Sequence, residues 1–199
     1  MGITKYKNRC CLHRLALIFL LSLFAAASAI PADAPGDAFA RIETKTFDKQ
    51  KFVFPDDLRA TRLNVVFLAM TKDQDTGEYL QKALIDWQTE LERRNAIADG
   101  VMAWHFPVIS GLPFFIKGIV TRAMRKEYDG KVPLDQAAVL FVDDIDEFAA
   151  EFGQVVDDRP TIVLATPDAR PLQIFKGDVT PEGADEITDA IKGWLNDAN

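Results

Sequence analysis

Cysteine is the residue that this sequence of 199 residues lacks most clearly. Its two cysteines, Cys10 and Cys11, are adjacent and precede the first long apolar run, so positions 12–199 contain no thiol. A thiolate is the nucleophile of thiol–disulfide exchange and a common structural ligand of zinc. Positions 12–199 can therefore form no disulfide, perform no thiol exchange and hold no cysteine-ligated metal, so we expect no cofactor and lean against an enzyme.

Positive charge is scarce as well, with 23 Lys and Arg against 30 Asp and Glu. Four of the basic residues and none of the acidic ones lie in residues 1–29, so residues 30–199 carry a net charge of −11. The phosphate backbone of nucleic acid repels such a chain. We expect no nucleic-acid partner.

The first 29 residues differ in kind from the rest. Basic residues come first, residues 15–23 are almost wholly apolar, and Ala27-Ser28-Ala29 forms an A-x-A cleavage site. This pattern predicts a signal peptide over residues 1–29 and a periplasmic or secreted protein. The alternative is an uncleaved leader that anchors the protein in the membrane, with the domain facing the periplasm.

Residues 30–41 contain Ala-Asp and Gly-Asp steps and prolines, and we expect a flexible lead-in there. The sequence is 48% hydrophobic, which is enough for one well-buried core. We therefore expect a single domain over residues 42–199.

Apolar runs and helical periodicities alternate along the domain. Runs of strand length predict strands at 62–70, 101–109, 137–142, 161–165 and 172–175. Helical spacing of apolar residues predicts helices at 75–91, 116–126, 144–152 and 180–195. We expect Asp75 to cap the first helix, because Glu78 follows at capping-box spacing. The expected core face of the second helix comprises Ile116, Ile119, Val120, Ala123 and Met124.

The order of these elements is β-α-β-α-β-α-β-β-α. Right-handed connections between alternating strands and helices produce a mostly parallel sheet with helices on both faces. The last two strands are separated by only a few residues and must pair antiparallel. The sequence therefore predicts a three-layer α/β/α sandwich with a mixed central sheet, a C-terminal antiparallel hairpin and a final helix.

The segment VDDIDEFAAEFGQVVDDRPTIVLATPDARPLQIFKGDVTPEGADEI, residues 142–187, resembles the C-terminal half of peroxiredoxin and TlpA-type proteins. The likeness lies in an aspartate after a strand, a short helix ending in an aromatic-Gly pair, a Pro-Thr step and a strand closed by glycine. It implies a thioredoxin-like fold and, by analogy, a cis Arg159–Pro160 bond. The active cysteines of such proteins follow the first long strand, where this chain has residues 71–77, TKDQDTG.

A longer resemblance covers residues 54–195 and involves cysteine-free thioredoxin-like proteins. The motifs FPDDL, FPVISGLPFFIKGIVTRAMRKEY and the helix ending in Phe152-Gly153 carry it. Two groups share these motifs: the YtfJ-like periplasmic proteins and the bacterial relatives of the mitochondrial ATP synthase assembly chaperone. Neither group implies catalytic residues for this chain.

Three groups of residues are candidates for a binding site. Thr71, Asp73 and Asp75 occupy the ancestral active-site turn and could bind a cation or small polar ligand, or simply cap a helix and turn. Lys117, Arg122, Arg125 and Lys126 concentrate positive charge, which could dock an acidic partner or lipid headgroups, or form a solvated helix face. Arg159, Pro160 and Thr161 form the third group, at the start of the penultimate strand.

His105 is the one histidine after residue 29, and it lies between Trp104 and Phe106. We expect a packed strand residue, because a zinc site would need carboxylates for its other ligands. We expect no metal site. The function that fits these observations is a non-redox thioredoxin-like domain that binds a protein partner in the cell envelope, as an accessory or assembly factor. The alternatives are an oxidoreductase relative with non-thiol or residual activity and a small-molecule or metal-binding module.

Overall fold

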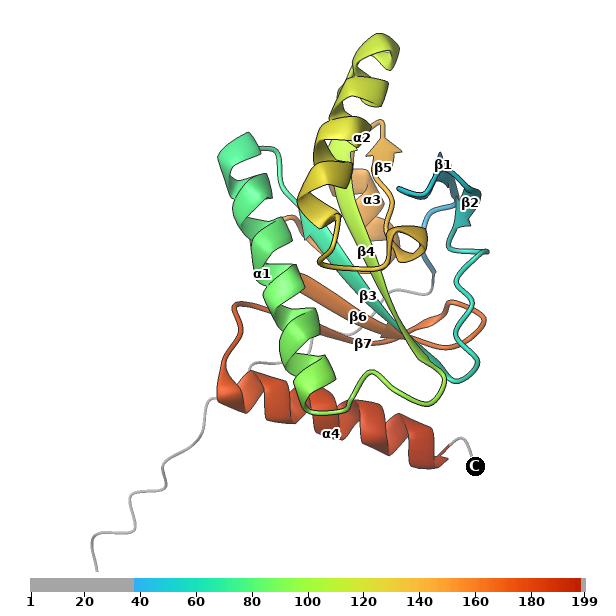
Figure 1. The fold of residues 1–199 in the computed structure, drawn as a ribbon, viewed down its shortest axis with the longest axis vertical. Helices are drawn as coiled ribbons and strands as arrows, with labels where there is room; N and C mark the ends of the chain where they lie inside the picture. Colours follow the sequence, from blue (N-terminus) through green and yellow to red (C-terminus); the bar gives the residue numbers. More distant parts are fainter. Residues whose placement is uncertain (1–37, 198–199) are drawn as a thin grey trace, which may run out of the picture. The chain divides into compact units, whose positions relative to one another are not determined.

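A computed structural model describes residues 38–197 of the chain (Figure 1). The predicted signal peptide and most of the predicted lead-in lie outside these residues. The strands are β1 (Ile42–Lys45), β2 (Lys51–Phe54), β3 (Leu63–Met70), β4 (Val101–Ser110), β5 (Leu140–Val142), β6 (Thr161–Ala165) and β7 (Pro171–Lys176). The helices are α1 (Gln74–Arg93), α2 (Phe114–Tyr128), the short 3-10 helix η1 (Leu134–Gln136), α3 (Ile145–Glu151) and α4 (Pro181–Asp197).

Five strands form the central sheet, in the order β5-β4-β3-β6-β7. β3 pairs in parallel with β4 and antiparallel with β6, so Leu68 lies opposite both Phe106 and Thr161. β5 continues the parallel half beside β4, and β7 forms an antiparallel hairpin with β6. The predicted α/β fold with a mixed sheet and a C-terminal hairpin and helix is confirmed.

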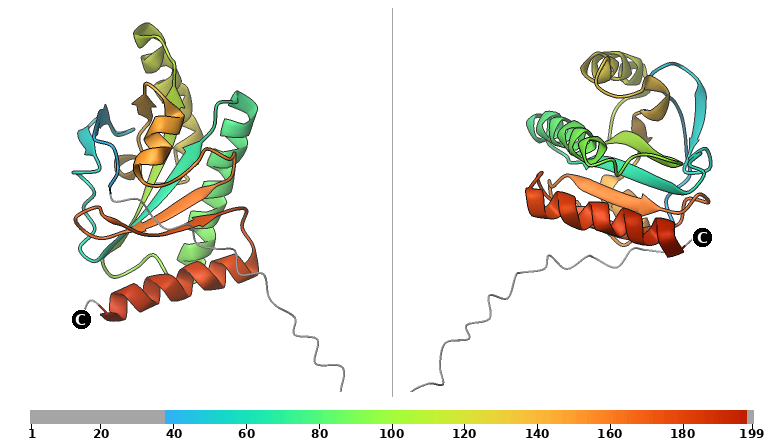
Figure 2. Two further views of the ribbon diagram at one scale, coloured as in Figure 1. Left: turned by 180° about the vertical axis from the view of Figure 1, so that it is seen from behind. Right: turned by 60° about the horizontal axis from the view of Figure 1, so that its bottom comes forward.

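The central strand β3 is buried along its whole length, because helices and a hairpin cover both faces of the sheet (Figure 2). Leu63, Val65, Phe67 and Ala69 face α1 and α4. The alternate residues of β3 face α3 and the β1-β2 hairpin. Residues that alternate along a strand point to opposite faces, so a continuous apolar run predicts this double burial.

The β1-β2 hairpin is a part of the fold that the sequence pattern did not predict. Each strand has only four residues, and its burial alternates, which gives a weak signal. Phe52 and Phe54 nevertheless pack in the core against aromatic rings of β4. Phe39 is also buried and packs on Phe54, so the packed domain begins before the expected residue 42.

A buried amide at the start of β3 connects three segments. The side chain of Asn64 accepts hydrogen bonds from the backbone N–H of Ala60 (3.2 Å) and from the indole N–H of Trp104 (3.0 Å). Its amide nitrogen donates to the carbonyl oxygen of Thr166 at 2.8 Å. Asn64 is fully buried, so the N–H groups of Ala60 and Trp104 would lack a partner if the amide were removed, whereas the carbonyl of Thr166 also accepts the N–H of Ala169 at 2.9 Å.

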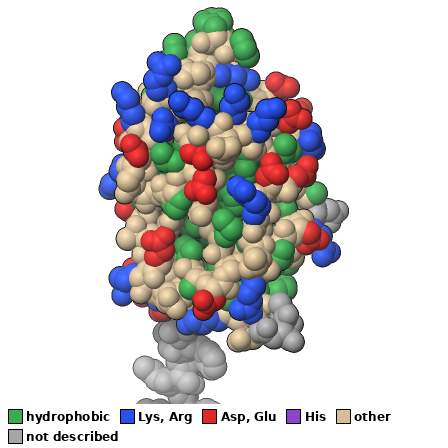
Figure 3. Space-filling view, turned by 45° about the vertical axis from the view of Figure 1, so that its right-hand side comes forward, with side chains coloured by type: hydrophobic (Ala, Val, Ile, Leu, Met, Phe, Trp, Pro, Cys, Tyr) green, Lys and Arg blue, Asp and Glu red, His purple; other side chains and the backbone are tan. Residues whose placement is uncertain are grey.

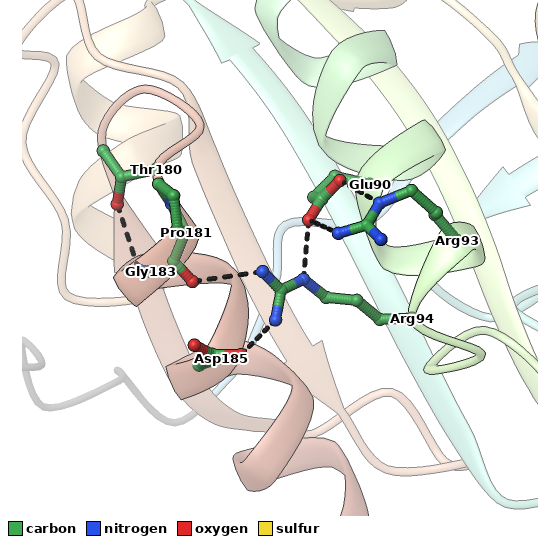
Figure 4. Close-up of polar contacts among 7 residues, drawn as sticks. All are labelled: Glu90, Arg93, Arg94, Thr180, Pro181, Gly183 and Asp185. Carbon is green, nitrogen blue, oxygen red and sulfur yellow. Dashed lines mark hydrogen bonds and ion pairs between the residues drawn. The ribbon is translucent and has the colours of Figure 1, made fainter.

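The helices α1 and α4, which share one face of the sheet, are joined at their ends by Arg94 (Figure 4). Arg94 donates to Glu90 at 2.7 Å, to the carbonyl of Pro181 at 3.3 Å and to Asp185. Hydrogen bonds from Arg93 and Arg94 lower the pKa of Glu90 to about 2. The carboxylate therefore stays charged over most of the acidic range.

Two local expectations were wrong. Asp73, not Asp75, caps α1, and its carboxylate accepts the N–H of Thr76 at 2.8 Å. In α2 the expected core face is only partly covered: Ile116, Val120 and Met124 are half-buried, whereas Ile119, 65% exposed, and Ala123 are open to solvent. Apolar periodicity shows that a helix face is apolar, but it does not show how much of that face another element covers.

Replacement of Asn64 by alanine should lower the free energy of unfolding by about 2 kcal/mol or more, because it leaves two donors, the N–H groups of Ala60 and Trp104, buried without partners. Urea unfolding followed by tryptophan fluorescence measures this difference. The matched control is Asn196→Ala in α4, where an exposed amide is removed and the change should stay within about 0.5 kcal/mol. Equal midpoints for the two variants would contradict the role given to Asn64.

Candidate functional site

The carboxyl edge of the central sheet collects the segments in which the sequence placed two of its three candidate groups. β3, β4 and β5 are parallel, so the residues that follow them meet at one edge. β6 runs the other way, and its first residues lie at the same edge, where Thr161 pairs opposite Leu68. We use the name carboxyl edge for residues 71–75, 111–115, 143–146, 155–160 and 177–179.

The turn after β3 is occupied by groups that stabilise the start of α1. Thr71 accepts the backbone N–H of Asp73 through its hydroxyl at 3.1 Å. The hydrogen bond from the backbone of Thr76 lowers the pKa of Asp73. Asp75 is exposed in the first turn, where a negative charge favours the helix dipole. Thr71 and Asp73 therefore have a capping function in this turn.

The start of α3 is built in the same way and touches that turn. Asp144 accepts the N–H groups of Asp146 (2.7 Å) and Glu147 (3.1 Å). Lys72 forms an ion pair with Asp146, and more than half of each side chain is exposed. An exposed pair of this kind contributes little to stability, so it can open for a ligand or partner at small cost.

Residues 38–197 contain no group of three or more His, Cys, Asp or Glu side chains placed to hold a metal ion. No helix within the same residues is long and apolar enough to cross a membrane. Asp73 serves as a cap and Asp75 is exposed in the first turn of α1, so these two carboxylates do not form a metal site.

The Arg159-Pro160-Thr161 step is a closed structural element. Pro160 is buried, and its carbonyl oxygen accepts the N–H of Gly177 at 3.0 Å. The hydroxyl of Thr161 is turned to the carbonyl of Arg159 at 3.2 Å. The expected cis bond at Arg159–Pro160 is not found: among residues 38–197 the cis peptide bond is Phe54–Pro55. A trans bond is the majority state of prolyl bonds.

Asp157 holds the cations beside Pro160. Arg159 donates to it at 2.6 and 2.9 Å, and the nearly buried ammonium of Lys176 lies 3.3 Å away. Burial raises the pKa of Asp157, but the hydrogen bond from Arg159 and the charge of Lys176 outweigh this effect, so the pKa is lowered. Of these three candidate residues, Arg159 remains accessible, with half of its side chain exposed.

The third candidate group lies on α2, which begins at the carboxyl edge and projects from the body of the domain (Figure 1). Lys117 faces inward, and its ammonium lies 5.1 Å from the ring centre of Phe141. Arg122 and Arg125 are exposed. These cations therefore do not converge with Thr71 and Asp73 in a single pocket.

Large hydrophobic side chains exposed at this edge were missed by the sequence analysis. The exposed fractions are 90% for Phe114, 77% for Phe115 and 68% for Val155. Figure 3 shows hydrophobic side chains at the projecting end of the domain, with Lys and Arg side chains directly below. The sequence feature that could have indicated this exposure is the pair Phe114-Phe115 at the start of a helix without a side-chain cap. It was overlooked because the apolar periodicity of α2 suggested a core helix.

His105 is a packed strand residue, as expected. Its ring stacks on Phe67 with centroids 4.5 Å apart, and its Nε2 lies 2.5 Å from the side-chain oxygen of Gln88. Nδ1 has no hydrogen-bond partner within the described part of the chain. Burial lowers the pKa of His105 to about 3, so the ring stays neutral.

A cavity of about 280 Å³ lies at the other end of the sheet, beside the β6-β7 turn. Its charged lining is paired internally, Arg41 with Asp56 and Arg170 with Asp168, each at 3.0 Å. These pairs are as exposed as Lys72–Asp146, so they do not decide between the two places. The exposed Phe114, Phe115 and Val155 lie at the carboxyl edge and not at this cavity, so the carboxyl edge is the better candidate site.

No protein-family model matches the chain, and no curated protein is similar to it at a significant level. Solved structures do match. BsSco, a member of the Sco family of cytochrome c oxidase assembly proteins, is 15% identical with a TM-score of 0.54, and the match covers 81% of this chain and 95% of that one. Arabidopsis thaliana ScoI with copper bound is 11% identical with a TM-score of 0.52, covering 80% and 98%.

A SCO1/SenC family lipoprotein from Bacillus anthracis is 11% identical with a TM-score of 0.51, and the match covers 80% of this chain and 96% of that one. These likenesses establish that the chain has a thioredoxin-like fold. The more specific resemblance to YtfJ-like proteins and to the ATP synthase assembly chaperone is not confirmed by them.

The neutral state of His105 generates a prediction on pH dependence. The unfolded chain binds a proton at His105 near pH 6.5, whereas the folded chain does so only near pH 3. The stabilisation is therefore present above pH 6.5 and is lost as the pH falls, by about 2 kcal/mol between pH 7 and 5. Residues 30–199 contain no other histidine, so in this part of the chain His105→Asn should flatten the slope.

Urea unfolding of wild type and His105→Asn at several pH values gives the two slopes. The absolute stability of the variant does not matter for this comparison, because only the difference between pH 7 and 5 is read. Equal slopes in the two proteins would contradict the buried, neutral state of His105.

Proposed function

We propose that this chain is an exported, non-redox thioredoxin-like domain that binds a protein partner of the cell envelope through its carboxyl edge. The observation that carries the proposal is the distribution of exposed large hydrophobic residues. In the described part of the chain, all of them except Trp194 lie in segments that begin or end at this edge: Tyr79, Phe114, Phe115, Ile119, Val155 and Val179. Exposed apolar groups that gather in one region mark an interaction surface.

Chemistry at the same edge supports binding over catalysis. The turn after β3 has Thr71, Lys72 and Asp73 where thiol-dependent relatives have cysteines, and no thiol is present in residues 12–199. Thr71 and Asp73 are engaged in capping α1. No group at the edge combines a nucleophile with a neighbouring base, which covalent catalysis requires.

The ion pairs of the carboxyl edge are at least partly exposed to solvent, so they can open when a partner binds. Lys72 and Asp146 pair in solvent, and Arg159 is half exposed beside Asp157. Such groups can form the polar rim around an apolar contact. The Sco family proteins that share this fold are cytochrome c oxidase assembly proteins. Their role supports the proposal that this chain is an assembly factor.

The experiment is site-specific photocrosslinking in the native cells. A photoreactive amino acid replaces Asp75 or Arg159, both exposed at the carboxyl edge, and in the control it replaces Lys192, which is exposed on α4. Mass spectrometry of the captured proteins should find one envelope protein with both edge positions and not with Lys192. Capture should be the same with and without a thiol reductant, because no thiol takes part.

Two outcomes would contradict the proposal. If the edge positions and Lys192 capture the same proteins, or none, the carboxyl edge is not the binding face. If a reductant abolishes capture, the interaction depends on a disulfide that the exported chain cannot form. Insulin reduction measured on the purified exported chain should, in parallel, proceed at the uncatalysed rate.

A further inference from the structure

Helix α2 has an unusual division along its exposed side. Phe114, Phe115 and Ile119 are exposed in its first two turns, and Arg122 and Arg125 are exposed in the turns that follow. At 100° per residue these side chains fall on one half of the helix, opposite Met124 and Tyr128, which anchor it to the domain. One side of a projecting helix is thus apolar at its tip and cationic behind it (Figure 3).

The basic side chains that follow the tip of α2 take part in no polar contact that stabilises the described part of the domain. Arg122, Arg125 and Lys126 form no ion pair or side-chain hydrogen bond with any residue in the described range 38–197, whereas Glu127 of the same helix pairs with Lys131. Concentrated positive charge on a chain with a net charge of −11 beyond residue 29 favours a negatively charged surface. Side chains without fixed hydrogen-bond geometry suit a diffuse anionic surface better than one carboxylate.

The spacing along the helix fits the profile of a bilayer. Arg122 lies seven positions after Phe115, which corresponds to about 10 Å of helix. Apolar faces of interfacial helices sink about 5–10 Å below the headgroups. Aromatic rings at the tip can therefore reach the acyl boundary while long cationic side chains remain at the phosphates.

The start of α2 adds to this fit. Its first turn contains no acidic residue, and no side chain caps its N-terminus. A helix N-terminus carries partial positive charge, so phosphates near the tip are favoured rather than repelled. In α1 and α3 the equivalent positions are occupied by the carboxylates of Asp73 and Asp144.

We propose that the tip of α2 inserts into the interface of an anionic lipid bilayer, with Phe114, Phe115 and Ile119 below the headgroups and Arg122, Arg125 and Lys126 at the phosphates. The helix then orients the carboxyl edge toward the membrane surface. This contact is separate from the protein partner proposed above and does not require it.

Vesicle binding of the chain purified after export tests the proposal. The vesicles contain about one quarter phosphatidylglycerol in phosphatidylcholine, and pure phosphatidylcholine vesicles serve for comparison. Wild type should prefer the anionic vesicles, and the binding should weaken as salt is added. Arg122→Gln/Arg125→Gln should bind at least about tenfold more weakly, because each cation near an anionic surface contributes roughly fivefold.

Phe114→Ser/Phe115→Ser should also lose at least about tenfold in binding, because two exposed rings no longer enter the apolar region. The matched control Lys82→Gln/Lys192→Gln removes the same charge from exposed positions on α1 and α4 and should stay within about twofold of wild type. All substitutions lie at exposed positions, and far-UV circular dichroism of each variant checks that it is folded. A retained leader would be common to all variants and would cancel in the comparison.

A label at the tip gives a second readout. The absence of cysteine from residues 12–199 allows a single Phe115→Cys or Lys192→Cys to carry an environment-sensitive fluorophore, with Cys10 and Cys11 changed to serine if the leader is retained. The emission at position 115 should shift to the blue on anionic vesicles, and the emission at position 192 should not.

Three results would overturn the proposal: wild type does not bind anionic vesicles, the aromatic variant binds them as well as wild type, or the control loses as much binding as the arginine variant. In the first case the tip of α2 fits an acidic protein surface instead. The assay contains no protein partner, so its failure would leave the photocrosslinking result standing, and the reverse also holds.

Discussion

The burial of β3 on both of its faces is the constraint on which the rest of the structure depends. A strand with eight consecutive buried residues needs cover on two sides, and it receives α1 and α4 on one and α3 with the β1-β2 hairpin on the other. Asn64 at its start ties this strand to β4 and to the β6-β7 turn. A domain without disulfides in residues 12–199 relies on this packing for its stability.

The same arrangement separates stability from binding. The parallel strands end together, and the segments that follow them meet at the carboxyl edge, where Ile145 belongs to the core and most of the other side chains do not. Lys72 and Arg159 can change partners there without disturbing β3. The projecting α2 extends this edge. Among the residues of α2 only Tyr128 is fully buried, so the exposed Phe114 and Phe115 contribute little to the packing of the core.

Sequence patterns predicted the central sheet well because their signals were strong. The apolar run of β3 and the Thr180-Pro181 start of α4 led to the correct elements. The weak points have physical causes. The cap of α1 is Asp73 and not Asp75, because sequence patterns locate a helix start only to within one or two residues. Ile119 was assigned to the core because periodicity shows that a helix face is apolar, but not that another element covers it. Three-dimensional placement was needed to see that Phe114 and Val155 belong to one exposed edge.

Hydrogen exchange of the folded protein, resolved along the chain, tests the central claim most directly. The claim is that stability resides in the layers around β3 and that the carboxyl edge, with α2, is free to bind. Amides of β3 and β6 should exchange only through global unfolding, and those of the first two turns of α2 at least about a hundredfold faster. Protection in α2 equal to that of β3 would contradict the account, because the helix would then be part of the stable core.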